Sequence, residues 1–237
     1  RLNETDLNKV VDLYEEKVAH GIRPLKFIPA SGAASRMFKD LYEALDSIEK
    51  TGSADVIQQN KGAKQYLEGF EKFAFTSDLV AIIRENKIEL NDKNKIGFLL
   101  NEKGLNYGSL PKGLLKFHKY ENGERTPFEE HLVEGAAYAK DKNNKVRLHF
   151  TVSPEHQKGF EDLVNKITSI YEEQLNVTFE IEFSQQKPST DTIAVNLRNE
   201  PFRENDGSLL FRPAGHGALI ENLNDINADI IFIKNID

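Results

Sequence analysis

The stretch "LKFIPASGAASRMF" covers residues 25–38 and decides the fold class. A short apolar run that suits a strand ends at Pro29, and five small residues follow it. Arg36 then lies at the start of a second pattern, in which apolar residues recur with helical spacing over 35–50. Ser35 is the residue type that caps such a helix. A strand, a small-residue loop and a helix in this order indicate an α/β fold.

The same alternation continues in the rest of the chain. Apolar runs or period-two alternation predict strands, and apolar residues at helical spacing predict the helices between them. The strands are expected over 25–29, 113–120, 146–152, 177–183 and 230–236, and the helices over 4–20, 35–50, 126–137, 156–175 and 217–223. The last strand is nearly all apolar, as in a strand covered on both faces. The sheet should therefore be mostly parallel, with helices on both faces.

One stretch departs from this alternation. Residues 52–107 are polar and show helical spacing without a convincing strand. We interpret 52–107 as a helical insertion between two parts of one core domain, 1–51 and 108–237.

Composition and charge exclude several classes of protein. The 237 residues are 39% hydrophobic and carry a net charge of −7, which favours a packed core and argues against a general nucleic-acid binder. There is no cysteine, so disulfides and thiolate chemistry are excluded. No apolar run has membrane-spanning length and no signal peptide is visible, so a cytoplasmic location is expected, although the chain begins with Arg1 and not with Met.

The loop after the first strand has the properties of an anion-binding site. Small side chains at 30–34 let backbone N–H groups approach phosphate oxygens, and a helix start adds partial positive charge. A cation such as Arg36 is disfavoured in the first turn of a helix, so a bound anion explains it better than helix stability does. The alternative is a tight turn of small residues that pack closely. The loop matches neither the P-loop nor the dinucleotide fingerprint.

Three further segments are candidates for chemistry. "LPKGLLKFH" over 110–118 places Lys112 before a strand, where its ammonium can reach a phosphate. "FRPAGHGALIENL" over 211–223 is a glycine-rich turn into a helix. "IFIKNID" ends in Asp237 after a predicted strand, and the carboxyl ends of parallel strands are where α/β sheets bind ligands. An aspartate there can hold Mg²⁺. The alternatives are an exposed loop lysine, an ordinary turn and a polar strand end.

Taken in order, these segments resemble the sugar-nucleotide pyrophosphorylases, and most closely the UDP-sugar branch. The family's first loop, roughly L-A-G-G-x-G-T-R-L, is similar to "IPASGAASRM", and its P-K-G-L motif is similar to residues 111–114. "ERTPFEEHLVEGA", "HFTVSPEH", "FEIEFSQQ" and "RPAGHGALI" resemble its next motifs, and "NID" resembles its closing V-D-N. The resemblance spans 24–51 and 108–237. The same motif series also resembles an uncharacterised bacterial family, a domain of unknown function.

The resemblance implies a Rossmann-like nucleotide-diphospho-sugar transferase fold and a role for each matching residue. Arg36 would stabilise charge on the β- and γ-phosphates, Lys112 would contact the α-phosphate, and Asp237 would bind Mg²⁺. The nucleotide itself would be bound by the first loop and by the segments that read the base: Ala30, Ser31, Gly32, Ala33, Ala34, Ser35, Gln185, Gln186, Gly215 and His216. The implied partners are a nucleoside triphosphate such as UTP and a sugar-1-phosphate, with no nucleic acid and no membrane.

Several positions depart from the family pattern. Ser31 and Ala34 replace two loop glycines, Ala214 replaces an aspartate, and the chain ends at Asp237, where the family continues into a sugar-binding half. We therefore expect a fragment that lacks that half. The implied reaction joins a sugar-1-phosphate to a nucleoside triphosphate and releases pyrophosphate. Two alternatives remain open: a binding module of the same fold that has lost catalysis, and a glycosyltransferase. The base, the sugar and the oligomeric state are left open.

Overall fold

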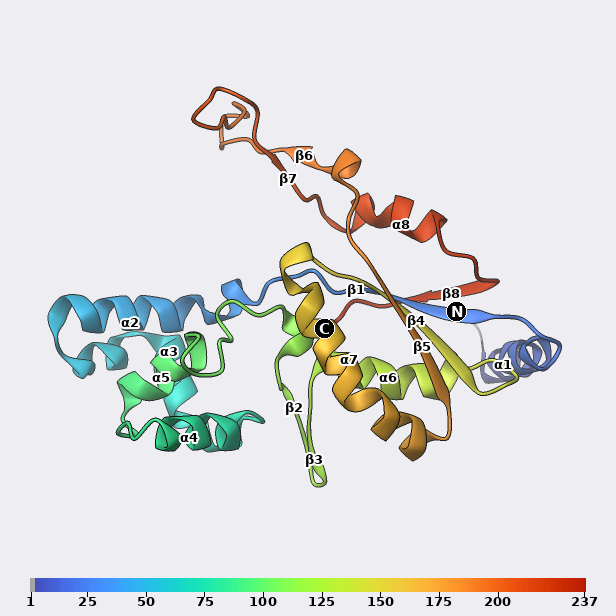
Figure 1. Ribbon diagram of the computed structural model, residues 1–237, viewed down its shortest axis with the longest axis horizontal. Helices are drawn as coiled ribbons and strands as arrows, with labels where there is room; N and C mark the ends of the chain where they lie inside the picture. The colour runs from blue at the N-terminus through green and yellow to red at the C-terminus, as the bar shows by residue number, and fades with distance from the viewer. Residues whose placement is uncertain (1–2) are drawn as a thin grey trace. The chain divides into compact units, whose positions relative to one another are not determined.

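The computed structural model describes residues 3–237, and for His216 the backbone alone. Its contacts divide the chain into two compact units (Figure 1). The first, the sheet unit, comprises Arg1–Ser31 and Leu132–Asn235. The second, the helical unit, comprises Gly32–His131 and Ile236–Asp237, so it takes in more of the chain than the insertion expected over 52–107.

The sheet unit is built on four parallel strands in the order β5-β4-β1-β8. Their bounds are Pro24–Pro29 for β1, Lys145–Thr151 for β4, Thr178–Ser184 for β5 and Ile230–Ile233 for β8. All three ladders are parallel. The predicted α/β class with a parallel sheet is therefore confirmed. The order changes direction at β1, whose neighbours are β4 on one side and β8 on the other.

Helices cover both faces of this sheet (Figure 1). One face is covered by α1 (Glu4–Ala19), α6 (Pro127–Tyr138) and α7 (Pro154–Leu175). The division into two units falls within α6. The contacts of these helices include Tyr14 on Phe232 and Phe160 on Phe183, at ring-centroid distances of 5.8 and 6.1 Å. On the other face α8 (Ile220–Asn224), with the 3-10 turn η6 (His216–Leu219) before it, packs on β1 and β8.

A charged cluster lies among the apolar contacts of the first face. Lys26 of β1 is 0% exposed, and its Nζ lies 2.7 Å from Oε2 of Glu134 in α6. The other carboxylate oxygen of Glu134 pairs with Lys234, which is half-exposed. Burial on its own would raise the pKa of Glu134, but the hydrogen bonds and charges of Lys234 and Lys26 lower it to about 2. Glu134 therefore compensates a buried cation.

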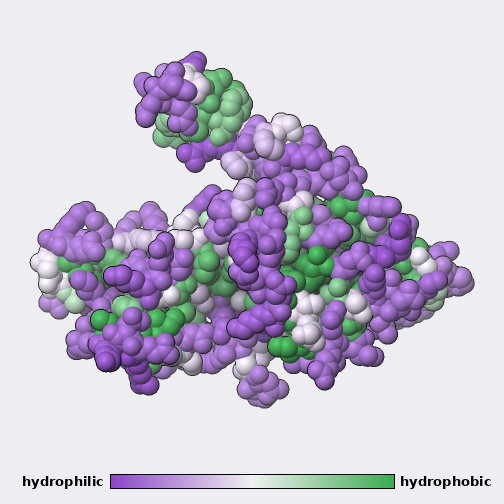
Figure 2. Space-filling view, viewed as in Figure 1, coloured by the Kyte–Doolittle hydropathy of each residue, from purple (hydrophilic) through white to green (hydrophobic). Residues whose placement is uncertain are grey.

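The strand expected over 230–236 is shorter and less buried than its composition suggested. β8 ends at Ile233, whose side chain is 60% exposed, and it pairs only with β1 among the described strands. Both faces of β8 are contacted, as predicted: the rings of Tyr14 and Tyr138 lie on Phe232 on one face, and Ile231 packs against the cluster under α8 on the other. The strand is only partly buried because it lies at the edge of the sheet. After β5 the chain forms the short antiparallel pair β6 (Thr192–Ile193) and β7 (Phe211–Arg212). Figure 2 shows hydrophobic side chains near the tip of this segment, where Leu197 and Phe202 are exposed.

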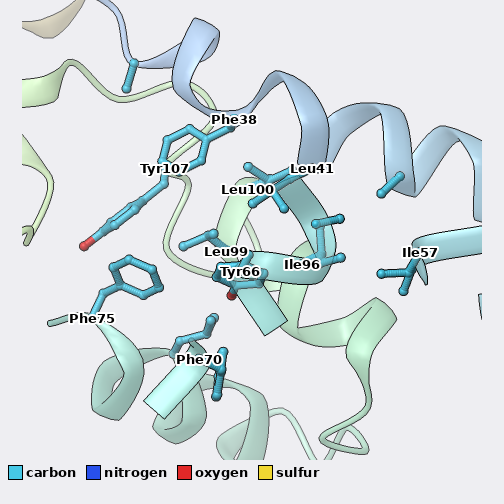
Figure 3. Close-up of a cluster of buried hydrophobic side chains, with 14 of the residues drawn as sticks. Phe38, Leu41, Ile57, Tyr66, Phe70, Phe75, Ile96, Leu99, Leu100 and Tyr107 are labelled. Carbon is cyan, nitrogen blue, oxygen red and sulfur yellow. The ribbon is translucent and has the colours of Figure 1, made fainter. Parts of the chain in front are cut away.

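The helical unit has a hydrophobic core of its own. Its helices are α2 (Lys39–Thr51), α3 (Lys61–Glu68), α4 (Thr76–Glu85) and α5 (Asp92–Leu100), joined by the 3-10 turns η2 (Ala54–Gln59) and η3 (Phe70–Lys72). Figure 3 shows how side chains from these helices meet, with Leu99 fully buried and the rings of Phe75 and Tyr107 edge to face at 5.3 Å. The stretch 52–107 is helical, as predicted.

Two predicted elements of this unit differ from the structure. The helix expected over 35–50 begins with the 3-10 turn η1 (Ser35–Phe38), because the Met37 amide bonds the Ala34 carbonyl three residues back. Ala34 is thus the residue before the first turn, and Ser35 caps nothing. The strand expected over 113–120 shrinks to β2 (His118–Tyr120) because η4 (Lys112–Leu114) is a turn and the Lys116 amide bonds the Tyr107 hydroxyl.

The helix start predicted at Thr126 is confirmed. β2 pairs with β3 (Gly123–Arg125), and α6 follows. The Thr126 hydroxyl accepts from the Glu129 amide at 3.2 Å, while the Glu129 carboxylate accepts from the Thr126 amide at 2.7 Å. This reciprocal pair is a capping box, which satisfies two backbone donors that the helix leaves unpaired.

Candidate functional site

Three segments that are far apart in the sequence meet in the helical unit. The Lys112 amide donates to the Gly32 carbonyl at 3.1 Å, and the Ala34 amide donates to the Leu110 carbonyl at 3.4 Å. This short antiparallel bridge holds the loop that follows β1 against the Pro111-Lys112 turn. The Lys112 ammonium in turn forms an ion pair with the carboxylate of Asp237. We call the set of residues 32–36, 110–112 and 237 the loop site.

The five small residues of the first loop divide into two kinds. Ala30 and Ala34 are fully buried, and their amides already donate to the carbonyls of Thr151 and Leu110. Packing explains why these two are small, and neither amide is available to a phosphate. Ser31, Gly32 and Ala33 are exposed. The amides of Gly32 and Ala33 have no hydrogen-bond partner within residues 3–237, so they are the donors that the loop leaves open.

Gly32 has no internal reason to be glycine. Its backbone has no left-handed φ, and a Cβ built there would meet no heavy atom within 4 Å. Glycine is usually kept where the backbone needs positive φ or where another group approaches closely. The first reason is absent at Gly32. The missing side chain leaves the space above the loop amides open.

Arg36 is the cation nearest in sequence to these amides. It lies in η1, is exposed, and forms no ion pair with any other residue in the described part of the chain. Lys112, in contrast, is about one-quarter exposed and held by Asp237. The loop site thus contains an uncommitted cation, open backbone donors and a lysine–carboxylate pair.

The loop site offers a magnesium ion one carboxylate, that of Asp237. Asp237 is half-exposed, and no cluster of three or more acidic, histidine or cysteine ligands occurs among residues 3–237. Mg²⁺ usually keeps several waters and binds through one or two carboxylates together with substrate phosphates. The carboxylate of Asp237 is therefore the one side chain of the loop site whose chemistry suits such an ion, as a single ligand beside waters and a ligand's own oxygens.

The predicted base-reading residues belong to the sheet unit. Gln185 and Gln186 follow β5, which is the edge strand opposite to β8. Their side-chain amides donate to Gln157 at 2.8 Å and to Asp191 at 3.0 Å. Gly215 precedes η6, and the side chain of His216 lies outside the described part. The structure gathers Arg36, Lys112 and Asp237 into one unit, and it places these four residues in the other.

Comparison with known proteins gives the family. A family model described as a domain of unknown function, DUF4301, matches residues 1–237. The chain belongs to that family. No curated protein and no solved structure matches this DUF4301 chain. Within residues 3–237, none of its helices has the length and apolar character needed to cross a bilayer.

Proposed function

We propose that the protein is a nucleotidyltransferase that joins a sugar-1-phosphate to a nucleoside triphosphate such as UTP, with release of pyrophosphate. The observation that carries the proposal is the ion pair between Lys112 and Asp237, formed beside a loop with open amides. A cation and a carboxylate side by side complement a metal-bound phosphate. The lysine can exchange the carboxylate for a phosphate oxygen, and the aspartate can exchange the ammonium for the metal ion. The proposal includes a Rossmann-like arrangement of the sheet.

The reaction needs positioning and neutralisation of charge more than it needs covalent help from the protein. The sugar phosphate oxygen attacks the α-phosphorus, and the bond to pyrophosphate breaks in line with it. In this proposal Lys112 binds the α-phosphate, where charge accumulates as the new bond forms. Arg36 and the amides of Gly32 and Ala33 bind the β- and γ-phosphates, which depart as pyrophosphate. Asp237 would hold Mg²⁺, whose charge would stabilise the departing group.

The loop site is connected along the chain to two strands of the sheet. The first loop continues directly from the end of β1, and Asp237 lies four residues beyond the end of β8.

A thermal-shift panel tests the binding half of the proposal. Nucleoside triphosphates and nucleotide-sugars are added to the protein with and without Mg²⁺. A ligand at 100 times its Kd stabilises the fold by about 2.7 kcal/mol, which is about 5–10 °C for a chain of this length. We expect such a shift for at least one nucleoside triphosphate with Mg²⁺. No shift with any nucleotide would contradict the proposal, whereas a shift without pyrophosphate release would favour the inactive binding module.

A further inference from the structure

A polar cavity lies on the face of the sheet that α8 covers. The register of β4 and β5 sets Arg147 opposite Glu180 and His149 opposite Glu182. These side chains line a cavity of about 390 Å³ together with Ser184, at the end of β5, and other residues of the sheet unit. The volume falls within the range of small-molecule sites, roughly 300–1,000 Å³.

The two ring nitrogens of His149 face two different partners in this cavity. Nε2 lies 2.7 Å from Oγ of Ser184, and Nδ1 lies 3.4 Å from Oε2 of Glu182. An ionised carboxylate only accepts hydrogen bonds, so the proton of neutral His149 belongs on Nδ1. Nε2 then accepts the hydrogen bond of the Ser184 hydroxyl. Burial lowers the pKa of His149 and Glu182 opposes that shift, so the ring is neutral at neutral pH and Nε2 can accept the hydrogen bond of Ser184.

Asn222 of α8 completes a chain of hydrogen bonds that runs in one direction. Its Nδ2 donates to the Gln185 carbonyl at 2.8 Å, which fixes the orientation of the amide because a carbonyl only accepts. The same Nδ2 donates to Oγ of Ser184 at 3.0 Å. The hydroxyl thus accepts from Asn222 while it donates to His149.

Asn222 lines the cavity and is 4% exposed. The group that it presents to Ser184 is Nδ2. Its Oδ1 has no hydrogen-bond partner within the described residues and is closed off from the cavity, so it does not contribute to binding there.

We propose that Ser184 is a nucleophile that His149 activates, and that the cavity hydrolyses small carboxylic esters. This site lies in the sheet unit and is independent of the nucleotidyltransferase proposal. Ser184 is half-buried and lines the cavity, so a small ester can reach it. Glu182 is a positioning residue, since it acts only through His149.

The reaction proceeds in two balanced steps. Oγ of Ser184 bonds to the ester carbonyl carbon as its proton passes to Nε2 of His149. The bond from that carbon to the alkoxy oxygen then breaks, and His149 returns the proton to the departing alcohol. A water molecule next attacks the acyl-serine and gives its proton to His149, which protonates Ser184 as the carboxylic acid leaves. The Asn222 N–H that donates to Oγ in the free protein would turn to the developing oxyanion as Oγ bonds to carbon, while the other N–H keeps its bond to Gln185.

The same unit contains a second serine–histidine pair that serves as a control. Oγ of Ser153 lies 2.7 Å from Nδ1 of His156, but the Glu155 carboxylate lies 3.8 Å from that same nitrogen. Ser153 is not among the residues that line the cavity, so a small ester bound there does not reach it. Ser153 should therefore be inert towards that ester, although its hydrogen bond to histidine is as short as that of Ser184.

The experiment combines covalent labelling with ester hydrolysis. The full chain is treated with an alkyl fluorophosphonate and digested, and the modified serine is located by mass spectrometry. p-Nitrophenyl acetate hydrolysis is then followed in the wild type and in Ser184→Ala, His149→Gln and Ser153→Ala, with circular dichroism to confirm folding. We expect an adduct on Ser184 alone, a loss of about 10²–10⁴-fold for His149→Gln, at least as large a loss for Ser184→Ala, and no change for Ser153→Ala.

Glu182 requires a readout that separates positioning from structure. Glu182→Gln should lower kcat while KM stays unchanged, and Glu182→Asp should restore part of kcat. Failure of the fluorophosphonate to modify Ser184 would overturn the proposal, as would unchanged hydrolysis in folded Ser184→Ala. Either result would leave the nucleotide proposal unaffected, because its readout is pyrophosphate release.

Discussion

Lys112 and Asp237 are 125 residues apart in the sequence and form an ion pair in the helical unit. The pair lies next to the bridge that holds Gly32 against the Pro111-Lys112 turn. Two surface charges in contact add little stability, typically about 0–1 kcal/mol. The pair therefore contributes little to the stability of the fold, and the nucleotide-binding role proposed for it is what the variants below test.

Asp237→Asn should uncouple nucleotide binding from Mg²⁺. The amide keeps the shape of the side chain but removes the charge that would hold the metal, so the stabilisation gained on adding Mg²⁺ to a nucleoside triphosphate should shrink. Isothermal titration with and without Mg²⁺ measures this coupling. If Asp237→Asn showed the same Mg²⁺ dependence as the wild type, Asp237 would be removed from the metal site.

Gly32→Ala should weaken nucleotide binding without affecting the fold. A methyl group there meets no protein atom within 4 Å and no left-handed backbone, but it would obstruct a phosphate against the loop amides. Gly52→Ala is the matched control, because Gly52 has φ +71° at the end of α2 and a side chain there costs about 1–2 kcal/mol. Thermal unfolding should show a lower Tm for Gly52→Ala only. A lower Tm for Gly32→Ala would show that the fold itself requires glycine at position 32, which would contradict this prediction.

Glu134→Gln should destabilise the protein strongly, because it leaves the buried ammonium of Lys26 without a counter-charge. Removing one partner of a buried pair typically costs about 3–5 kcal/mol. Lys234→Gln should cost much less, since Lys234 is half-exposed and Glu134 would still face Lys26. Denaturant unfolding of both variants compares the two costs, and equal losses would refute this account of the cluster.

The lowered pKa of the Glu134 carboxylate predicts a pH range in which acid reduces the stability of the protein. The folded pKa of Glu134 is about 2 and its ordinary value is 4.5, so the unfolded chain takes up the proton first as the pH falls. Its contribution to stability is complete above about pH 4.5 and is lost as the pH falls towards 2. Unfolding free energies measured from pH 5 to pH 2 should fall more steeply for the wild type than for Glu134→Gln. Parallel curves would show that Glu134 does not titrate in this way.

The α/β class and most element positions could be predicted from the sequence, because hydrophobic periodicity reports which face of each segment is buried. The alternation of Phe179, Ile181 and Phe183 predicted β5, and the capping box at Thr126 predicted the start of α6. Strand order cannot be read from periodicity. The position of β8 at the edge of the sheet could therefore not be predicted, and its apolar composition gave no sign of it.

The sites show the same division. Local pattern singled out Arg36, Lys112 and Asp237, and tertiary structure was needed to show that Lys112 contacts Asp237. His149 and Ser184 were missed as a pair. The alternation of β5 sets Glu182 and Ser184 on one face, but only the register with β4 brings His149 to them. Register depends on contacts between distant segments, and the local pattern of a single sequence does not reveal those contacts.

The most direct measurement is pyrophosphate release from UTP and a panel of sugar-1-phosphates by the wild type, Lys112→Ala and Lys116→Ala. Lys116 is the matched control, because it also pairs with an aspartate of the helical unit, Asp78 at 2.6 Å, but lies outside the loop site. We expect Lys112→Ala to lose about 10²–10³ in rate, while Lys116→Ala keeps the wild-type rate. Equal rates in Lys112→Ala and the wild type, or no pyrophosphate from the wild type with any pair of substrates, would contradict the account.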